Sequence, residues 1–227
     1  MCKIRIISSS SAGNCYLLMA NKEVLILDAG VPFKDVKVTL DFNIRQISGV
    51  LVTHSHGDHA KYAHEYEAAG IPVWEPYKME NLRQSRRFGR FTAQSFPVTH
   101  SVPTVGYLIE HGDLGRVLYV TDCSYIEFKF RNLNTILIEA NWGQEFVHKD
   151  EPKYMHSLQH HMSIETCVET IRANTSSALR HVLLCHLSGN NSDERAFKEA
   201  VRKIVPSDVT VDIAVPGGEV DLREVPF

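Results

Sequence analysis

Short runs of apolar residues, each closing on a polar residue, recur along the chain. The five clearest are Val24–Asp28, Gly49–Thr53, Val117–Asp122, Thr135–Glu139 and Val182–His186. Runs this short and rich in β-branched residues predict strands buried on both faces. Two further runs, Ile4–Ile7 and Tyr16–Met19, predict an N-terminal hairpin around a Ser/Gly/Asn-rich loop over residues 8–14.

Helical periodicity lies between and after these runs. Residues 60–69 predict one helix, and residues 163–173 predict a second, with apolar residues at helical spacing behind a good N-cap, Ser163. Residues 192–205 predict a last helix, with Asn191 opening a capping box. Strands mixed with helices that can cover both outer faces predict an α/β sandwich.

Composition narrows the class of protein. The 227 residues suit a single domain over 1–227, and 44% hydrophobic with 22% charged residues is ordinary for a globular chain. The net charge of -3 gives no overall basic field, and no apolar run approaches the roughly 18 residues of a membrane span. Five scattered cysteines without a Cys-x-x-Cys pair predict a reducing, cytoplasmic setting.

Histidine is abundant, with 12 residues, and the densest group follows the predicted strand at residues 49–53. His54, His56, Asp58 and His59 place four ligand-type side chains within six residues, with Gly57 allowing a tight turn. Imidazole and carboxylate together suit zinc and other borderline metals. So many such groups at one strand end would be electrostatically awkward without a cation, and the segment therefore predicts a metal site.

The string from Thr53 to His59 resembles the signature of the metallo-β-lactamase superfamily. The resemblance implies a four-layer αββα sandwich, with two mixed sheets, outer helices and a binuclear metal site at the sheet edges. It implies one metal on His54, His56, His100 and Asp122, and another on Asp58, His59, Asp122 and His186. It also implies that Asp28 accepts a ligand imidazole N–H and fixes its tautomer.

Two divalent cations, zinc, manganese or iron, would share a hydroxide that attacks the substrate. The ligands alone leave ester, thioester, lactam, lactone and phosphodiester substrates open. A bridging Asp122 is more typical of the thioesterase and phosphodiesterase branches of the superfamily.

Other segments resemble one bacterial branch, the YycJ-like or WalJ-like hydrolases described as exonucleases or phosphodiesterases. They are residues 9–16, 137–141, 161–163 and 186–191. This resemblance implies a phosphodiesterase or DNA exonuclease, with a thioester or lactone hydrolase of the glyoxalase II type as the alternative.

Candidate residues for chemistry and substrate lie around the predicted ligands. Asp58 and His161 are the candidate catalytic residues, since His161 precedes a helix N-terminus that could hold an anion and could itself protonate a leaving alkoxide. The candidate substrate contacts are Ser163, Asn190, Asn191, Arg86 and Arg87, the last two in a run of arginines and phenylalanines that can pair with phosphate and stack on bases. The expected partner is nucleic acid or a small phosphodiester and not a membrane. The oligomeric state stays open, with a homodimer among the alternatives.

Overall fold

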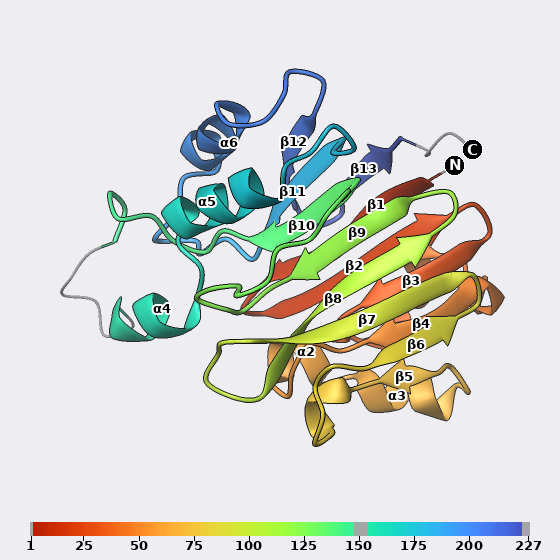
Figure 1. Cartoon of the computed structure of the whole chain (residues 1–227). Helices are drawn as coiled ribbons and strands as arrows, with labels where there is room; N and C mark the ends of the chain where they lie inside the picture. Colours follow the sequence, from red (N-terminus) through yellow and green to blue (C-terminus); the bar gives the residue numbers. More distant parts are fainter. Residues whose placement is uncertain (1, 148–153, 224–227) are drawn as a thin grey trace.

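Two β-sheets lie face to face with helices on both outer sides in the computed structural model, which describes residues 2–147 and 154–223 (Figure 1). The first sheet has the order β13 (Glu219–Leu222), β1 (Cys2–Ser10), β2 (Gly13–Ala20), β3 (Glu23–Leu27), β4 (Ile47–Leu51) and β5 (Val73–Trp74). The second has the order β12 (Thr210–Ile213), β11 (His181–Cys185), β10 (Thr135–Glu139), β9 (Gly115–Val120), β8 (Thr104–His111), β7 (Phe91–Val98) and β6 (Ser85–Phe88).

The helices divide between the two outer faces. They are α1 (Phe33–Thr39), α2 (Gly57–Ala60), α3 (Ala63–Ala68), α4 (Tyr154–His160), α5 (Ile164–Asn174) and α6 (Glu194–Arg202), with short 3₁₀ turns at Ile44–Gln46 and Pro76–Lys78. Helices α1 and α3 pack on the first sheet, and α5 and α6 pack on the second. None of the described helices is long and apolar enough to cross a membrane.

Alternation along the strands builds the layers. In β3, Leu25 and Leu27 lie in the core between the sheets, whereas Val24 and Ile26 pack under the outer helices. Because successive side chains of a strand point to opposite faces, a strand apolar at every position needs cover on both sides. The predicted four-layer αββα sandwich is confirmed.

Most predicted elements are present, with shifts at their ends. The N-terminal hairpin is longer than predicted, because β1 runs to Ser10 and β2 begins at Gly13. The helix predicted over 60–69 is replaced by α2 and α3, which are separate. The capping prediction for the last helix was wrong: the Asp193 side chain accepts the backbone N–H of Ala196 at 2.7 Å and caps α6 in place of Asn191. Ser163 caps α5 as predicted.

Strand direction decides where the polar strand ends meet. β3 and β4 are parallel, as are β9, β10, β11 and β12. Parallel neighbours bring their carboxyl ends to one edge of a sheet. The polar residues that close these strands therefore gather along one side of the sandwich.

Candidate metal centre

Three strand-end residues of this side share an unusual backbone conformation. Asp28, Asp122 and His186 follow β3, β9 and β11 with φ of 62°, 47° and 52°. Left-handed backbone costs a non-glycine residue roughly 1–2 kcal/mol, and such residues cluster at functional sites. All three side chains are buried: Asp122 Oδ1 lies 3.3 Å from His186 Nδ1, and the Asp28 and Asp122 carboxylates lie 2.8 and 3.3 Å from the His59 ring between them. The turns thus bring the three side chains together at the sheet edge.

A short helix supplies the next two side chains. Asp58 and His59 lie in α2, where the His59 N–H donates to the carbonyl of His56 at 3.0 Å. The turn fits closely against the loop after β3, because a Cβ on Gly30 would lie 1.7 Å from the carbonyl oxygen of Asp58. Only glycine allows this approach.

Three histidines form a first cluster. His54 Nε2 lies 3.1 Å from His56 Nδ1, which lies 3.3 Å from His100 Nε2. One ring nitrogen of each lies within 4.8 Å of the others. Asp122 Oδ2 is 3.9 Å from His54 Nε2, so a carboxylate oxygen borders the cluster.

Asp58, His59, Asp122 and His186 form a second cluster, with one donor atom of each within 4.8 Å of the rest. His59 Nε2 is 3.3 Å from Asp58 Oδ2 and 3.3 Å from Asp122 Oδ1. The two oxygens of Asp122 therefore face different clusters, Oδ2 the first and Oδ1 the second. The structure brings together all seven side chains that the resemblance named.

The donor set fits divalent metals, because four histidines direct Nδ1 to an oxygen outside their cluster. The pairs are His54 with Thr53 Oγ1 at 3.0 Å, His59 with Asp28 Oδ2 at 2.8 Å, His100 with the His160 carbonyl at 2.9 Å, and His186 with Glu139 Oε1 at 2.9 Å. The partners of His59, His100 and His186 are carboxylate or carbonyl oxygens, which can only accept, so Nδ1 of these rings carries the proton and Nε2 is left as a lone-pair donor. The Thr53 hydroxyl donates to Asp28, which leaves its oxygen free to accept from His54 Nδ1. His186 Nε2 is buried and has no hydrogen-bond partner in residues 2–147 and 154–223.

Glu139, the last residue of β10, is the functional candidate that the sequence prediction missed. Its side chain is fully buried, and Oε2 accepts the backbone N–H groups of Cys123 and Met162 at 3.0 and 3.1 Å. Oε1 accepts from Nδ1 of His161 at 2.7 Å and from Nδ1 of His186 at 2.9 Å. Four donors occupy the carboxylate, so we interpret it as a group that positions histidines. The signal was a charged residue closing a buried strand, as at Asp122.

Burial and charge act against each other throughout the site. Burial would raise the pKa of Asp122, but His186 and His59 outweigh it and hold that pKa well below its usual range. Burial lowers the pKa of His100 to about 4, so this ring is neutral at pH 7. Burial also opposes charge on His161, yet Glu139 raises the pKa of His161 to about 9.

The candidate substrate residues are placed unevenly. Ser163 is buried, and its hydroxyl accepts the Thr166 N–H at 3.1 Å as the cap of α5. Asn190 is exposed, whereas Asn191 is buried with a side-chain oxygen that has no partner among the described residues. Their contact with substrate stays a prediction.

Arg86 and Arg87 do not lie with the clusters. In the β6–β7 register they pair with Ala93 and Thr92, seven and eight residues before His100. At about 3.3 Å per strand residue, this places them more than roughly 20 Å from that ligand candidate. Their contact with substrate, predicted from the arginine run, also stays a prediction and would require a long substrate.

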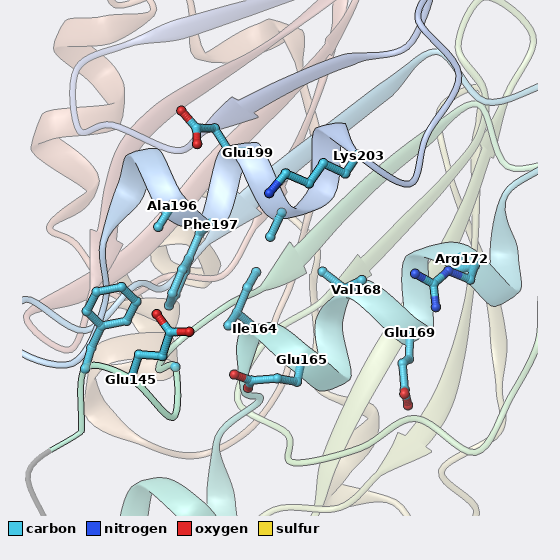
Figure 2. A pocket seen from close by; sticks show the side chains of 13 residues that line it. Glu145, Ile164, Glu165, Val168, Glu169, Arg172, Ala196, Phe197, Glu199 and Lys203 are labelled. Carbon is cyan, nitrogen blue, oxygen red and sulfur yellow. The ribbon is translucent and has the colours of Figure 1, made fainter.

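A separate groove of about 510 Å³ lies between α5 and α6 and contains no residue of the clusters (Figure 2). Its floor is apolar, with Ile164, Val168 and Phe197 among its side chains. Its charged lining residues are Glu145, Glu165, Glu169, Glu199, Arg172 and Lys203. Four carboxylates against two cations repel a polyanion, so this groove does not suit a nucleic acid.

Comparison with known proteins gives the same class as the fold and clusters. Residues 10–121 match the Metallo-beta-lactamase superfamily. The chain is 22% identical to Exodeoxyribonuclease YycJ of Bacillus anthracis over 88% of each protein. It is 26% identical to Exodeoxyribonuclease WalJ of Streptococcus pneumoniae, over 93% of this chain and 91% of that protein.

Solved structures share the fold at low identity. The metallo-beta-lactamase fold protein YhfI of Bacillus subtilis superposes with a TM-score of 0.72 at 17% identity, over 96% of this chain and 98% of that one. The short form of human tRNase Z superposes with a TM-score of 0.65 at 12% identity, over 97% and 99%.

The fold and the paired His/Asp clusters define a metal-dependent hydrolase with the metallo-β-lactamase fold, and residues 10–121 match the metallo-β-lactamase superfamily. Over most of its length the chain is similar to YycJ and WalJ.

Proposed function

We propose that this hydrolase is a binuclear phosphodiesterase that degrades DNA as an exonuclease. Similarity to two proteins named exodeoxyribonucleases supports DNA as the substrate. The observation that carries the proposal is the position of Asp122 between two nitrogen-rich clusters, beside the His161–Glu139 pair. Two metal sites with a charged histidine next to them suit a phosphoryl group, which must be neutralised and must release an alkoxide.

The proposed ligands divide as the clusters do. His54, His56 and His100 would hold one divalent ion and Asp58, His59 and His186 the other, with Asp122 contacting both. Bound there, zinc, manganese or iron would lower the pKa of water and neutralise charge on phosphoryl oxygens.

His161 is the proposed general acid. Its Nδ1 lies 2.7 Å from Glu139 Oε1 and 4.0 Å from Asp122 Oδ2, and the side chain is 12% exposed. Glu139 keeps the imidazole protonated at neutral pH, because it raises the pKa of His161 to about 9 against the effect of burial. A protonated imidazole at this position can donate a hydrogen bond to a non-bridging oxygen and a proton to the departing sugar oxygen.

The test compares two leaving groups. We expect His161→Ala to lower the rate on labelled DNA by about 10²–10⁴-fold. The rate on bis(p-nitrophenyl) phosphate should change far less, because nitrophenolate leaves without a proton. His64→Ala, which removes an exposed histidine of α3, is the matched control and should behave as the wild type.

The substrate panel and metal analysis complete the test. Protein loaded separately with Mn and Zn is given single- and double-stranded DNA labelled at either end, and a set of thioesters. Cleavage of DNA ends with two metal ions per chain supports the proposal. Turnover of thioesters without any cleavage of phosphodiesters would refute it and favour the glyoxalase II type of reaction.

A further inference from the structure

The segment between β9 and β10, green in Figure 1, runs without regular secondary structure over residues 125–130, after a bend at Ser124. Its start is fixed, because the Ser124 N–H donates to the carbonyl of Thr99 at 3.2 Å, next to His100. Burial then alternates: Ile126 is buried and Phe128 and Phe130 are half-buried, while Tyr125, Glu127 and Lys129 are exposed. Period-two burial shows that one row of side chains packs inward and the other faces solvent.

Tyr125 is the exposed aromatic nearest in sequence to a proposed ligand, three residues after Asp122. It is 53% exposed. The exposed ring of Tyr125 is available for stacking, and a nucleobase can stack on an aromatic face.

Arg83, an exposed residue, packs on the half-buried Phe128 of this segment. Its guanidinium carbon lies 4.9 Å from the centre of the Phe128 ring. The adjacent residue, Gln84, pairs with Ser95, whose hydroxyl accepts the Gln84 N–H at 3.1 Å. Ser95 is five residues before His100, so Arg83 is the member of the arginine run closest to the metal centre along β7. Tyr125 and Phe128 are three residues apart, or about 10 Å in an extended chain.

The charge of this surface suits a polyanion. The exposed charged side chains of the segments 79–87 and 124–130 are Arg83, Arg86, Arg87, Lys129, Glu80 and Glu127. Four cations face two carboxylates here, in a chain of net charge -3. The groove between α5 and α6 has the opposite balance.

We propose that Tyr125 and the Arg83–Phe128 pair bind a single strand of nucleic acid whose end lies at the metal centre. The Tyr125 ring stacks on a base close to the scissile phosphate, and Arg83 contacts a phosphate or base farther along the strand. The proposal rests on the phosphodiesterase function above and gives it a substrate class, single-stranded ends, with no preference for base identity.

The experiment measures binding and cleavage separately. Fluorescence anisotropy with a fluorescein-labelled oligothymidylate carrying phosphorothioate linkages gives Kd, and bis(p-nitrophenyl) phosphate reports the metal centre without any base. We expect Tyr125→Ala to weaken oligothymidylate binding by about 5- to 100-fold, and Tyr125→Phe to stay within about twofold of the wild type. Arg83→Ala should weaken binding and flatten the slope of log Kd against log salt by about 0.7. Phe42→Ala removes a ring that is 69% exposed on another part of the surface and serves as the control.

The outcomes separate the two proposals. If the wild type cleaves DNA but Tyr125→Ala and Arg83→Ala both bind oligothymidylate as the wild type does, this inference is wrong and the phosphodiesterase function stands. If the wild type hydrolyses bis(p-nitrophenyl) phosphate but neither binds nor cleaves DNA, the choice of DNA as substrate is wrong, and this inference with it. An equal loss of binding in Phe42→Ala would also overturn the inference.

Discussion

Replacing Glu139 by glutamine tests the role of a buried carboxylate that is not a proposed ligand. Glu139 accepts four hydrogen bonds, from the backbone of Cys123 and Met162 and from the rings of His161 and His186. The amide of Glu139→Gln has one oxygen and one NH₂ group. Whichever way it is turned, two of the four donors then face a group that cannot accept.

The structure sets the size of the expected changes in the free energy of unfolding and in the pKa of His161. Two buried donors left without an acceptor cost about 1–3 kcal/mol each, so the free energy of unfolding should fall by about 2–6 kcal/mol. The rise in the His161 pKa from 6.5 to about 9 corresponds to about 3 kcal/mol in favour of the charged ring. Without the carboxylate, burial remains and the His161 pKa falls to 6.5 or below. With the His161 pKa back at its ordinary 6.5, the protonated fraction drops about 30-fold at pH 8 but only by about a quarter at pH 6.

The assay is the pH dependence of DNA cleavage, with metal content and Tm measured on the same samples. Wild-type activity should fall as the pH rises through about 9, where His161 loses its proton. In Glu139→Gln this fall should move to more acidic pH by more than two pH units, roughly. Glu110→Gln, at a carboxylate 46% exposed, is the matched control. An unchanged alkaline limb in Glu139→Gln, with metal retained, would refute the assignment of His161 as the proton donor.

Three more perturbations bear on the metal centre. Asp58→Asn removes a proposed ligand and should lower the metal content by about one ion per chain, measured by elemental analysis, and slow cleavage by about 10- to 100-fold. Gly30→Ala should displace the turn at Asp58, because the new Cβ would lie 1.7 Å from the Asp58 carbonyl oxygen, and should therefore reduce both Tm and metal content. Gly57→Ala is the control: a Cβ there has nothing within 4 Å, so it should cause no such displacement. Removal of metal with a chelator should lower Tm, and the Tm of the stripped protein should rise again with added zinc or manganese in a concentration-dependent way.

The fold and the residues of the two metal-ligand clusters could be predicted, because both depend on the pattern of apolar runs and polar strand ends in the sequence. Buried strands such as Thr135–Glu139 are marked by unbroken apolar runs, and this one was predicted with its observed bounds. Parallel neighbours then place their carboxyl ends together, so polar strand ends like Asp122 and His186 are expected to meet. Within the Thr53–His59 string, the spacing of the histidines and the aspartate alone predicts that their side chains lie close together.

The pattern of apolar and polar residues could not predict which side chains contact each other. Glu139 closes its strand like Asp122, but its partners come from residues 16 to 47 positions away along the chain. The arginine run gives a second example, because composition marked Arg86 and Arg87 but could not show that the register of β6 with β7 places them far from His100. Register is a property of two strands and is poorly visible in the sequence of one.

Carboxylates and imidazoles from the strand ends, α2 and the segment before α5 alternate in one chain across the site. Asp28 meets His59 at 2.8 Å, His59 meets Asp122 at 3.3 Å, Asp122 meets His186 at 3.3 Å, and Glu139 joins His186 at 2.9 Å to His161 at 2.7 Å. Each buried carboxylate therefore has an imidazole beside it, which is the condition for burying so many anions together.

Metal binding would change the balance of charge in this chain of carboxylates and imidazoles. Burial opposes charge on His59 and His186, but Asp122 and its neighbouring carboxylates outweigh it and raise the pKa of both rings. A divalent cation requires the ring nitrogen that faces it to be deprotonated, so binding must release these protons and must weaken as the pH falls. Asp28 and Glu139 would keep the Nδ1 protons of His59 and His186 in place, since each accepts from that atom. Bound cations would then supply the positive charge between the carboxylates that a protonated imidazole supplies otherwise.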